Sequence, residues 1–309
     1  MPNLLITGVT GFLGSVLAER LLGSGFKVIG VDRREKGFLS PRVFGHKDFS
    51  FFKVDINRKG RLSACLRQNK IKAIFHLASR QPSSREISYE DYYNGNVLSA
   101  FNVARAAGEN RVELLVFTST VSVYGSLPGG GAIDIGTHPE PLNYYGLSKY
   151  MAEKILEIGL NGTQAKLAIV RFSSLYGKNH LGGLVHTFYQ SAIRNEPINV
   201  FSMGRRYKNL LHVYDAGAIL ERIFKNRRKL SRRELFLAGS RNSLKMKDIA
   251  LLLKGLTGSQ SPVILDSRGA PYDHDILLDI SRAKRVLGFK PMSIEEGLRL
   301  YVKEMRNEI

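Results

Sequence analysis

The 309-residue chain has no tryptophan, a single cysteine, and only 27 acidic residues against 46 lysines and arginines. One cysteine excludes an internal disulfide and a multi-cysteine metal site, and we expect Cys65 to be a small buried side chain in a helix. The chain also lacks an apolar run of the roughly 18 residues that a membrane span needs. Its first residues lack the basic and then apolar order of a secretory signal. We therefore expect a cytoplasmic protein without a membrane span.

The shortage of acidic residues leaves a formal net charge of +19. Such a charge favours an anionic partner, which can be a phosphorylated metabolite, a nucleic acid or an anionic membrane surface. The apolar content of 43% is close to the globular average of about 45–50%, so the excess charge does not come from a depleted core. Composition alone predicts a globular protein and leaves the class of its partner open.

Short apolar runs alternate with helix-periodic stretches along the first half of the chain. We predict strands near 3–7, 27–32, 51–53, 73–77, 114–118 and 167–172, and helices near 12–22, 61–68, 94–107 and 144–158. This alternation is typical of parallel strands joined by crossover helices. It predicts an α/β fold with a doubly wound sheet of the Rossmann type, in which ligands bind at the carboxyl ends of the strands.

The alternation loosens after residue 176. There we predict helices near 184–194, 214–224, 246–256 and 294–305, with a short strand near 235–238. We expect a Rossmann domain over 1–174 and a smaller second domain that takes up most of 175–309, with segments near 209–240 returning to the first. The sequence Leu-Pro-Gly-Gly-Gly at 127–131 is either a mobile loop near a ligand or an ordinary surface loop.

Three glycines at three-residue spacing, Gly8, Gly11 and Gly14, separate the first predicted strand from the first predicted helix. Glycines in this place allow a tight turn, close approach of the backbone to a pyrophosphate, and close packing of the helix on the strand. Asp32 ends the next strand, where a carboxylate can accept hydrogen bonds from the adenosine ribose. The pattern predicts a dinucleotide site in the first domain.

The residues around Asp32 bear on which dinucleotide binds. A carboxylate repels a 2′-phosphate, so we expect NAD rather than NADP. Arg33 and Arg34 leave NADP open, because either guanidinium could hold such a phosphate. Asp55 follows the third strand, where it either meets the adenine or serves as a helix cap or turn residue.

Tyr145 and Lys149 are four residues apart on a predicted helix and share one face. At about 4 Å and an effective dielectric of about 20, their attraction amounts to about 4 kcal/mol. The ammonium could therefore lower the pKa of the phenol toward the range of a general base. A second pair, Tyr150 and Lys154, is rotated by about 140° from the first, and we interpret it as a surface or subunit-contact pair.

Together these motifs resemble the extended short-chain dehydrogenase/reductase superfamily, and within it the NAD-dependent epimerase/dehydratase family that acts on nucleotide sugars. The resemblance covers nearly the whole chain. Its motifs lie at 7–14, 31–32, 54–56, 75–79, 96, 119–125, 145–149, 170–177, 211–215 and 287–291. In this family, helices corresponding to 94–108 and 145–160 often pair across a two-fold axis, so the resemblance suggests a homodimer.

The resemblance also implies roles for individual residues. Tyr145 would be the catalytic base and acid, Lys149 would bind the nicotinamide ribose and lower the pKa of Tyr145, and Thr120 would bond the reacting sugar hydroxyl. The implied NAD site comprises Gly8, Gly11, Phe12, Leu13, Gly14, Asp32, Arg33, Asp55, Ile56, Leu77, Ala78, Ser79, Asn96, Tyr145 and Lys149. The implied contacts to a nucleotide-diphosphate sugar come from Thr120, Ser174, Lys208 and Arg268. No metal site is implied.

The two residues after Thr120 limit which reactions of the family this chain can catalyse. Sugar 4,6-dehydratases of the family carry an Asp-Glu pair where this chain has Val121 and Ser122, and decarboxylases usually keep a glutamate at the second position. GDP-fucose synthases use a cysteine shortly afterwards, which is absent here. We therefore expect an NAD-dependent epimerase of a nucleotide sugar, acting at C4 by transient hydride transfer to tightly bound NAD.

Two alternatives stay open. One is an NAD(P)-dependent reductase or dehydrogenase of a nucleotide sugar or another small carbonyl compound, because Thr120, Tyr145 and Lys149 serve net redox chemistry equally well. The other is a non-catalytic, RNA-associated member of the superfamily, suggested by the net charge and by the basic run at 222–233. We expect no nucleic-acid partner, and peripheral association with a membrane surface stays open.

Overall fold

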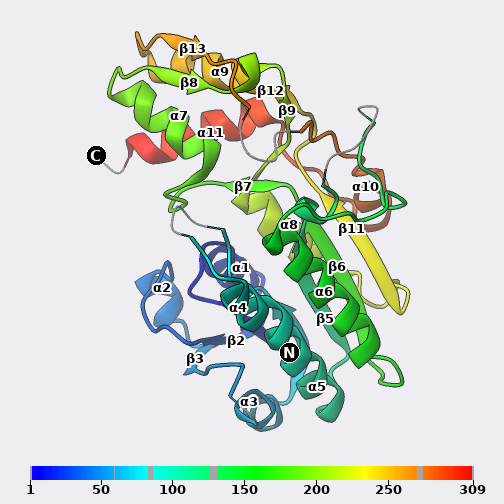
Figure 1. The fold of residues 1–309 in the computed structure, drawn as a ribbon. Helices are drawn as coiled ribbons and strands as arrows, with labels where there is room; N and C mark the ends of the chain where they lie inside the picture. Colours follow the sequence, from blue (N-terminus) through cyan, green and yellow to red (C-terminus); the bar gives the residue numbers. More distant parts are fainter. Residues whose placement is uncertain (1, 59, 83–85, 126–130, 270–273, 308–309) are drawn as a thin grey trace.

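The computed structural model describes the whole chain except residues 1, 59, 83–85, 126–130, 270–273 and 308–309. Most of the loop expected at 127–131 thus lies outside the described residues. A central sheet of seven parallel strands has the order β11-β6-β5-β4-β1-β2-β3 (Figure 1). These strands are β1 (Asn3–Thr7), β2 (Lys27–Asp32), β3 (Phe49–Lys53), β4 (Ile71–His76), β5 (Leu114–Thr120), β6 (Lys166–Phe172) and β11 (Arg233–Ala238).

The strand order reverses at β1, with β2 and β3 on one side and β4, β5, β6 and β11 on the other. A reversal of this kind opens a crevice at the carboxyl ends of the strands. The predicted Rossmann-type α/β fold is confirmed.

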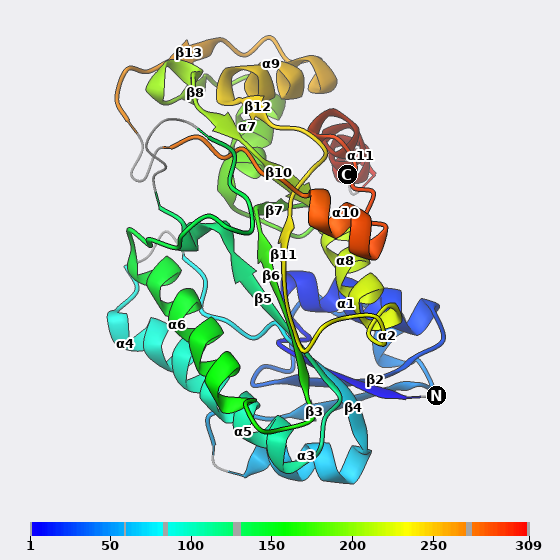
Figure 2. The ribbon, with the colours of Figure 1, turned by 90° about the vertical axis from the view of Figure 1, so that its right-hand side faces the viewer.

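Two layers of helices cover the sheet, as Figure 2 shows from the side. One layer contains α1 (Phe12–Gly23), α2 (Pro41–Phe44), α8 (Val213–Lys225) and α10 (Ser281–Leu287), and the other contains α3 (Arg61–Asn69), α5 (Ser99–Glu109) and α6 (Tyr144–Gly159). Side chains of a strand alternate between its two faces, so Leu4 and Ile6 pack under the first layer while Leu5 packs under the second. Cys65 is buried in α3, as expected.

A smaller part lies beyond the carboxyl ends of the sheet. It contains three strand pairs: β7 (Ser174–Tyr176) with β10 (Leu210–His212), β8 (Ile198–Val200) with β13 (Val263–Leu265), and β9 (Tyr207–Lys208) with β12 (Leu244–Lys245). Three helices, α7 (Gly183–Ile193), α9 (Met246–Thr257) and α11 (Ile294–Arg306), share a separate hydrophobic core with these strands. We propose the division near residue 174 on this basis, with β11 returning to the central sheet.

Short helical turns complete the chain path: α4 (Tyr89–Tyr92) leads into the π-helical turn η1 (Tyr93–Leu98), and the 3₁₀ turns η2 (Val121–Val123) and η3 (Ser202–Gly204) follow β5 and β8. Among the described residues, no helix has the length and apolar character needed to cross a membrane.

Glu221 of α8 links this helix to α1 on the first face of the sheet. Its buried carboxylate accepts hydrogen bonds from Arg20 and Ser24 at the end of α1 and pairs with Lys225. Burial alone raises the pKa of this carboxyl, but the hydrogen bonds of Lys225 and Ser24 and the charge of Arg20 lower it overall. The charged form of Glu221 is thus favoured by folding.

We predict that Glu221→Gln lowers the free energy of unfolding by about 1–2 kcal/mol at pH 7. A carboxyl whose pKa is lowered in the folded state stabilises above its unfolded pKa of about 4.3, and this contribution is lost as the pH falls through the folded pKa. Urea unfolding at a series of pH values should therefore show the difference between variant and wild type shrinking below about pH 4. The exposed Glu19 of α1 provides the control, Glu19→Gln, and a difference independent of pH would contradict the prediction.

Candidate active site

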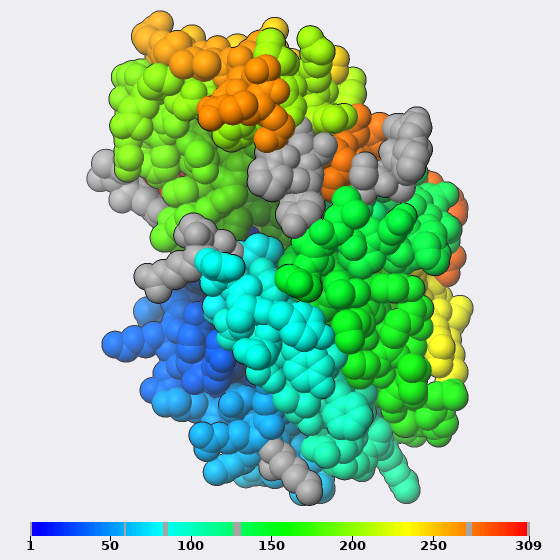
Figure 3. Space-filling view, viewed as in Figure 1, coloured from blue at the N-terminus to red at the C-terminus, as the bar shows by residue number. Residues whose placement is uncertain are grey.

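The central sheet and the smaller part enclose a cleft of about 910 Å³ between them. Figure 3 shows one face of the molecule, with the smaller part above and the part that contains the central sheet below. The lining comes from the β1–α1 turn, from the carboxyl ends of β2, β4, β5 and β6, and from β7 and α7. Predicted site residues that line it are Gly8, Gly11, Phe12, Leu13, Gly14, Asp32, Arg33, Asp55, Ile56, Leu77, Ala78, Ser79, Thr120, Tyr145 and Ser174.

The β1–α1 turn is packed so closely that two of its positions accept only glycine. Gly8 has a φ of +71°, and a Cβ there would lie 2.7 Å from the backbone nitrogen of Ala78. A Cβ on Gly14 would collide with the carbonyl oxygen of Gly8 and lie 2.8 Å from the Cα of Val9. The first turn of α1 therefore sits directly against the end of β1 and near the end of β4.

The N-terminus of α1 opens into the cleft without a side-chain cap. Gly11 occupies the capping position, and no side chain accepts a hydrogen bond from the first turn, which also contains no acidic residue. The first N–H groups of a helix have no partner within the helix and carry a partial positive charge. Phe12, Leu13 and Gly14 present this end to the cleft, so the turn fits the diphosphate of a dinucleotide.

Asp32 is held in place at the end of β2 by hydrogen bonds to its carboxylate. One oxygen accepts from the hydroxyl and the N–H of Thr10, at 2.7 and 3.2 Å, and the other accepts from the N–H of Arg34 at 3.1 Å. Asp55 both lines the cleft and forms a turn, because its carboxylate accepts from the N–H of Asn57 at 3.0 Å. Arg33 and Arg34 line the same end of the cleft as Asp32.

Thr120 and Tyr145 meet where β5 and α6 approach each other. The side chain of Asn143 caps α6 by accepting from the N–H of Gly146 at 2.7 Å. A Cβ on Gly146 would collide with the carbonyl oxygen of Ser122, so this glycine lets the start of α6 lie against the end of β5. Burial raises the pKa of Tyr145, and side-chain hydrogen bonds with Gln81 and Thr120 lower it.

Gln81 is a cleft residue that the sequence motifs did not identify. The hydroxyl of Tyr145 donates to Gln81 Oε1 at 2.8 Å, and Gln81 Nε2 donates to Ser79 Oγ at 3.0 Å. Gln81 lies two residues after the 75–79 motif, and this proximity is the feature of the sequence that could have identified it as a cleft residue. A carboxamide suits this place because it can accept from a phenol or, when turned, donate to a phenolate.

Asn96 does not line the cleft. It is 1% exposed, and its Oδ1 accepts from Ser79 Oγ and the N–H of Arg80, while its Nδ2 donates to the carbonyl of Arg80 and to Ser148 Oγ. These four bonds occupy the carboxamide. The structure therefore places Asn96 behind the 79–80 segment, where it fixes two cleft residues against α6, and direct contact with NAD stays a prediction.

Lys149 is buried below the cleft, 2% exposed, with its ammonium 4.2 Å from the centroid of the Phe117 ring. Burial lowers the pKa of Lys149 to about 7, and the charge of Glu153 opposes this shift. Burial raises the pKa of Tyr145 to about 12, and Lys149 is not among the groups that move it. The ammonium is directed at the Phe117 ring of β5, and the lowering of the Tyr145 pKa by Lys149 stays a prediction.

Two of the predicted substrate residues are not brought to the cleft. Lys208 lies on β9, where its ammonium donates to the carbonyl of His274 at 3.2 Å. The side chain of Arg268 is 79% exposed and pairs with Asp266 through a contact of 2.6 Å. Only Thr120 and Ser174 of the predicted substrate set line the cleft, so the roles of Lys208 and Arg268 stay predictions.

His180 is another cleft residue that sequence reasoning missed. Its ring stacks on Phe12 with 5.0 Å between centroids, beside the uncapped turn of α1. Burial, followed by the charge of His186, lowers the pKa of His180.

Tyr150 and Lys154 lie outside the cleft, with Lys154 ion-paired to Glu157. Among the described residues, no group of three or more histidine, cysteine or acidic side chains could hold a metal ion.

The fold and this cleft define an enzyme of the Rossmann class that uses a dinucleotide. A family model described as the NAD dependent epimerase/dehydratase family matches residues 4–239. The chain belongs to this family, and NAD is accordingly the cofactor that the glycine turn and Asp32 fit.

Relatives of known name are similar over nearly their whole length. The chain is 26% identical to UDP-glucuronate 4-epimerase of Thermodesulfobacterium geofontis, over 100% of this chain and 98% of the relative. It is 26% identical to UDP-glucose 4-epimerase of Lactobacillus helveticus, over 94% and 92% of the two chains.

Solved structures give the same picture of the fold. The UDP-glucose 4-epimerase of Thermotoga maritima with UDP-glucose has a TM-score of 0.87 at 24% identity, with 99% of both chains covered. MoeE5 in complex with UDP-glucose and NAD has a TM-score of 0.84 at 26% identity, again with 99% of both chains covered.

We predict that Gly14→Ala weakens NAD binding by at least about tenfold, or about 1.4 kcal/mol, because the new Cβ forces α1 away from the turn. Gly23→Ala is the matched control, since a Cβ at this position of the same helix meets nothing within 4 Å. Calorimetric titration of NAD into each variant measures the effect. Equal affinity in both variants would show that the close packing at Gly14 does not shape the site.

Proposed function

We propose that this protein is a nucleotide-sugar epimerase that inverts C4 and keeps NAD tightly bound. The observation that carries the proposal is the shared cleft: Tyr145 and Thr120 lie in the same cleft as the uncapped turn of α1. A dinucleotide held at the turn can therefore reach a sugar held at the two hydroxyls. The names of the 4-epimerases that the chain resembles support the same reaction.

In this reaction Tyr145 removes the proton of the sugar 4-hydroxyl and later returns it. Thr120 orients that hydroxyl, since its own hydroxyl both donates and accepts. NAD, held by the turn of α1 and by Asp32, would supply the hydride acceptor and donor for C4 of the sugar. A phenol with a pKa of about 12 is protonated at neutral pH, so the phenolate must be stabilised by nearby positive charge. Lys149, one turn along α6, is the residue proposed to supply it.

The cleft favours epimerisation over dehydration at the positions that follow Thr120. Val121 and Ser122 form the turn η2 and line the cleft, and neither carries a carboxyl that could act as a second acid or base. Epimerisation needs one proton moved at the 4-hydroxyl oxygen, for which Thr120, Tyr145 and Lys149 suffice, while NAD would supply the hydride acceptor for C4. The substrate is proposed to be a uridine-diphosphate sugar of the kind named for the relatives, and the place of action the cytoplasm.

We predict that the purified protein interconverts UDP-glucose and UDP-galactose, or the corresponding glucuronate pair, without added reductant. Tyr145→Phe should lower kcat by about 10²- to 10⁴-fold, the usual worth of a general acid-base group. Tyr150→Phe is the matched control, because this tyrosine lies on the same helix outside the cleft. Product that forms only with stoichiometric NAD(P)H would replace the epimerase by the reductase, and undiminished turnover in Tyr145→Phe would remove Tyr145 from its role.

A homodimer built on α5 and α6 is part of the proposal. The two helices pack side by side on one face of the sheet (Figure 2). They expose large apolar side chains, among them Phe101 at 53%, Tyr144 at 59% and Ile158 at 75%, which a second copy could cover.

Light scattering at micromolar concentration should give twice the chain mass of 34.5 kDa. Phe101→Glu should shift the mass toward the monomer, because a charge buried in the interface is unfavourable. A monomeric wild-type protein would contradict the dimer and leave the epimerase proposal untouched.

A further inference from the structure

Glu153 is a buried carboxylate on the same face of α6 as the two proposed catalytic residues. It lies one turn beyond Lys149 and two turns beyond Tyr145, at the spacing that places side chains above one another on a helix. Its side chain is 2% exposed. The carboxylate accepts from Ser119 Oγ at 2.5 Å and from Arg171 Nε and Nη2 at 3.0 and 2.6 Å.

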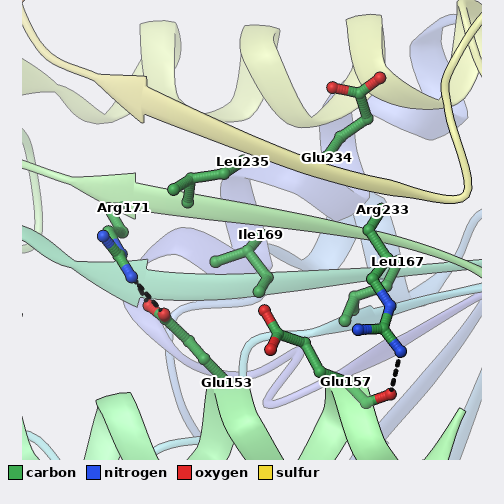
Figure 4. Close-up of a pocket in the computed structure, with 8 residues that line it drawn as sticks. All are labelled: Glu153, Glu157, Leu167, Ile169, Arg171, Arg233, Glu234 and Leu235. Atoms are coloured by element: carbon green, nitrogen blue, oxygen red, sulfur yellow. Dashed lines mark hydrogen bonds and ion pairs between the residues drawn. The ribbon is translucent and has the colours of Figure 1, made fainter. Parts of the chain in front are cut away.

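Arg171 and Ser119 fix this carboxylate from the two neighbouring strands. Figure 4 shows the guanidinium of Arg171, on β6, directed at Glu153, on α6. Arg171 also donates to the hydroxyl of Tyr124 at 2.7 Å. Ser119 immediately precedes Thr120 on β5, so the bond from Ser119 to Glu153 ties the strand end that carries Thr120 to the helix that carries Tyr145.

Lys149 lies between this carboxylate and the phenol of Tyr145 along the helix. The Phe117 ring of β5 lies against its ammonium, and His76 of β4 acts on the same region, with a pKa lowered to about 3 by burial and then by the charge of Lys149. On β6, Arg171 directs its guanidinium at Glu153. His76 is therefore neutral, and Glu153 is the anion whose charge acts on Lys149.

We propose that Glu153 is a positioning residue for the reaction: its carboxylate, held by Arg171 and Ser119, supplies the negative charge that keeps Lys149 cationic, one helical turn from Tyr145. This inference rests on the proposed function of Tyr145 and Lys149. It gives the buried ion pair of Glu153 and Arg171 a task beyond packing, because a neutral pair of similar shape could fill the same space but could not stabilise an ammonium.

Glu157 offers a matched control on the same helix. It lies one turn beyond Glu153 and lines the same small cavity between α6, β6 and β11 (Figure 4). Its carboxylate pairs with Lys154 on the surface. Removing the charge of Glu157 therefore changes the same part of α6 without changing the charge next to Lys149.

The first experiment is the pH profile of kcat for Glu153→Gln and Glu157→Gln. Without the carboxylate at 153, the pKa of Lys149 falls further, so its ammonium is lost at a lower pH. The high-pH limb of the Glu153→Gln profile should move down by about one pH unit or more, with kcat about tenfold lower at pH 8 and KM nearly unchanged. The Glu157→Gln profile should match the wild type. Superimposable profiles of all three proteins would overturn the proposal.

The single variant leaves Arg171 buried without its anion, which can unfold the protein. The double variant Glu153→Gln/Arg171→Met removes both charges and separates the two effects. Its thermal unfolding midpoint should recover toward the wild type, while its pH profile stays shifted in the direction of the single variant. Recovery of both stability and the wild-type profile would mean that the ion pair is only structural.

A readout independent of turnover is the ionisation of Lys149 itself. In protein labelled with ¹³C-lysine, the Cε resonance of Lys149, assigned by its absence in Lys149→Arg, reports the ammonium directly. Its titration midpoint should lie lower in the double variant than in the wild type. An unchanged midpoint would overturn the role of Glu153 whether or not the protein is an epimerase, whereas a shifted midpoint in a protein without epimerase activity would overturn only the proposed function.

Discussion

The arrangement of this protein depends on how closely the first turn of α1 lies against the ends of β1 and β4. Gly8 and Gly14 leave no room for a Cβ, because it would meet Ala78, Val9 or the carbonyl of Gly8. This contact brings the uncapped helix end to the carboxyl edge of the sheet at the strand-order reversal. Everything else in the cleft is placed relative to that edge: the acidic residue at the end of β2, the hydroxyl at the end of β5, and the phenol at the start of α6.

The fold and the centre of the site could be predicted from the sequence because they follow from local patterns. Apolar runs give the strands, glycines give the turn, and the rule that ligands bind at carboxyl strand ends brings Asp32, Thr120 and Tyr145 together. The surroundings could not be predicted. Gln81 reaches the phenol because of the path of the segment after β4. The carboxamide of Asn96 is fully hydrogen-bonded to Ser79, Arg80 and Ser148. The pKa values depend on burial, which the spacing of residues does not reveal.

The net charge of +19 has a partly structural explanation. Lys166, at the start of β6, donates to the carbonyls of Arg227 and Leu230 in the basic run, just beyond the end of α8. Cations near a helix C-terminus interact favourably with its exposed carbonyls. Part of the basic run therefore lies at the C-terminus of α8. In the cleft, the positive charge comes from the N-terminus of α1 and from Arg33, Arg34 and Arg80.

The central claim is that C4 of the sugar loses a hydride and regains the same one. UDP-glucose deuterated at C4, turned over by the purified protein with NAD and no reductant, tests it most directly. The account predicts UDP-galactose that retains the deuterium at C4 by mass spectrometry and NMR, with no net consumption of cofactor. Loss of the deuterium to solvent, or its appearance in a stoichiometric amount of released cofactor, would contradict the account.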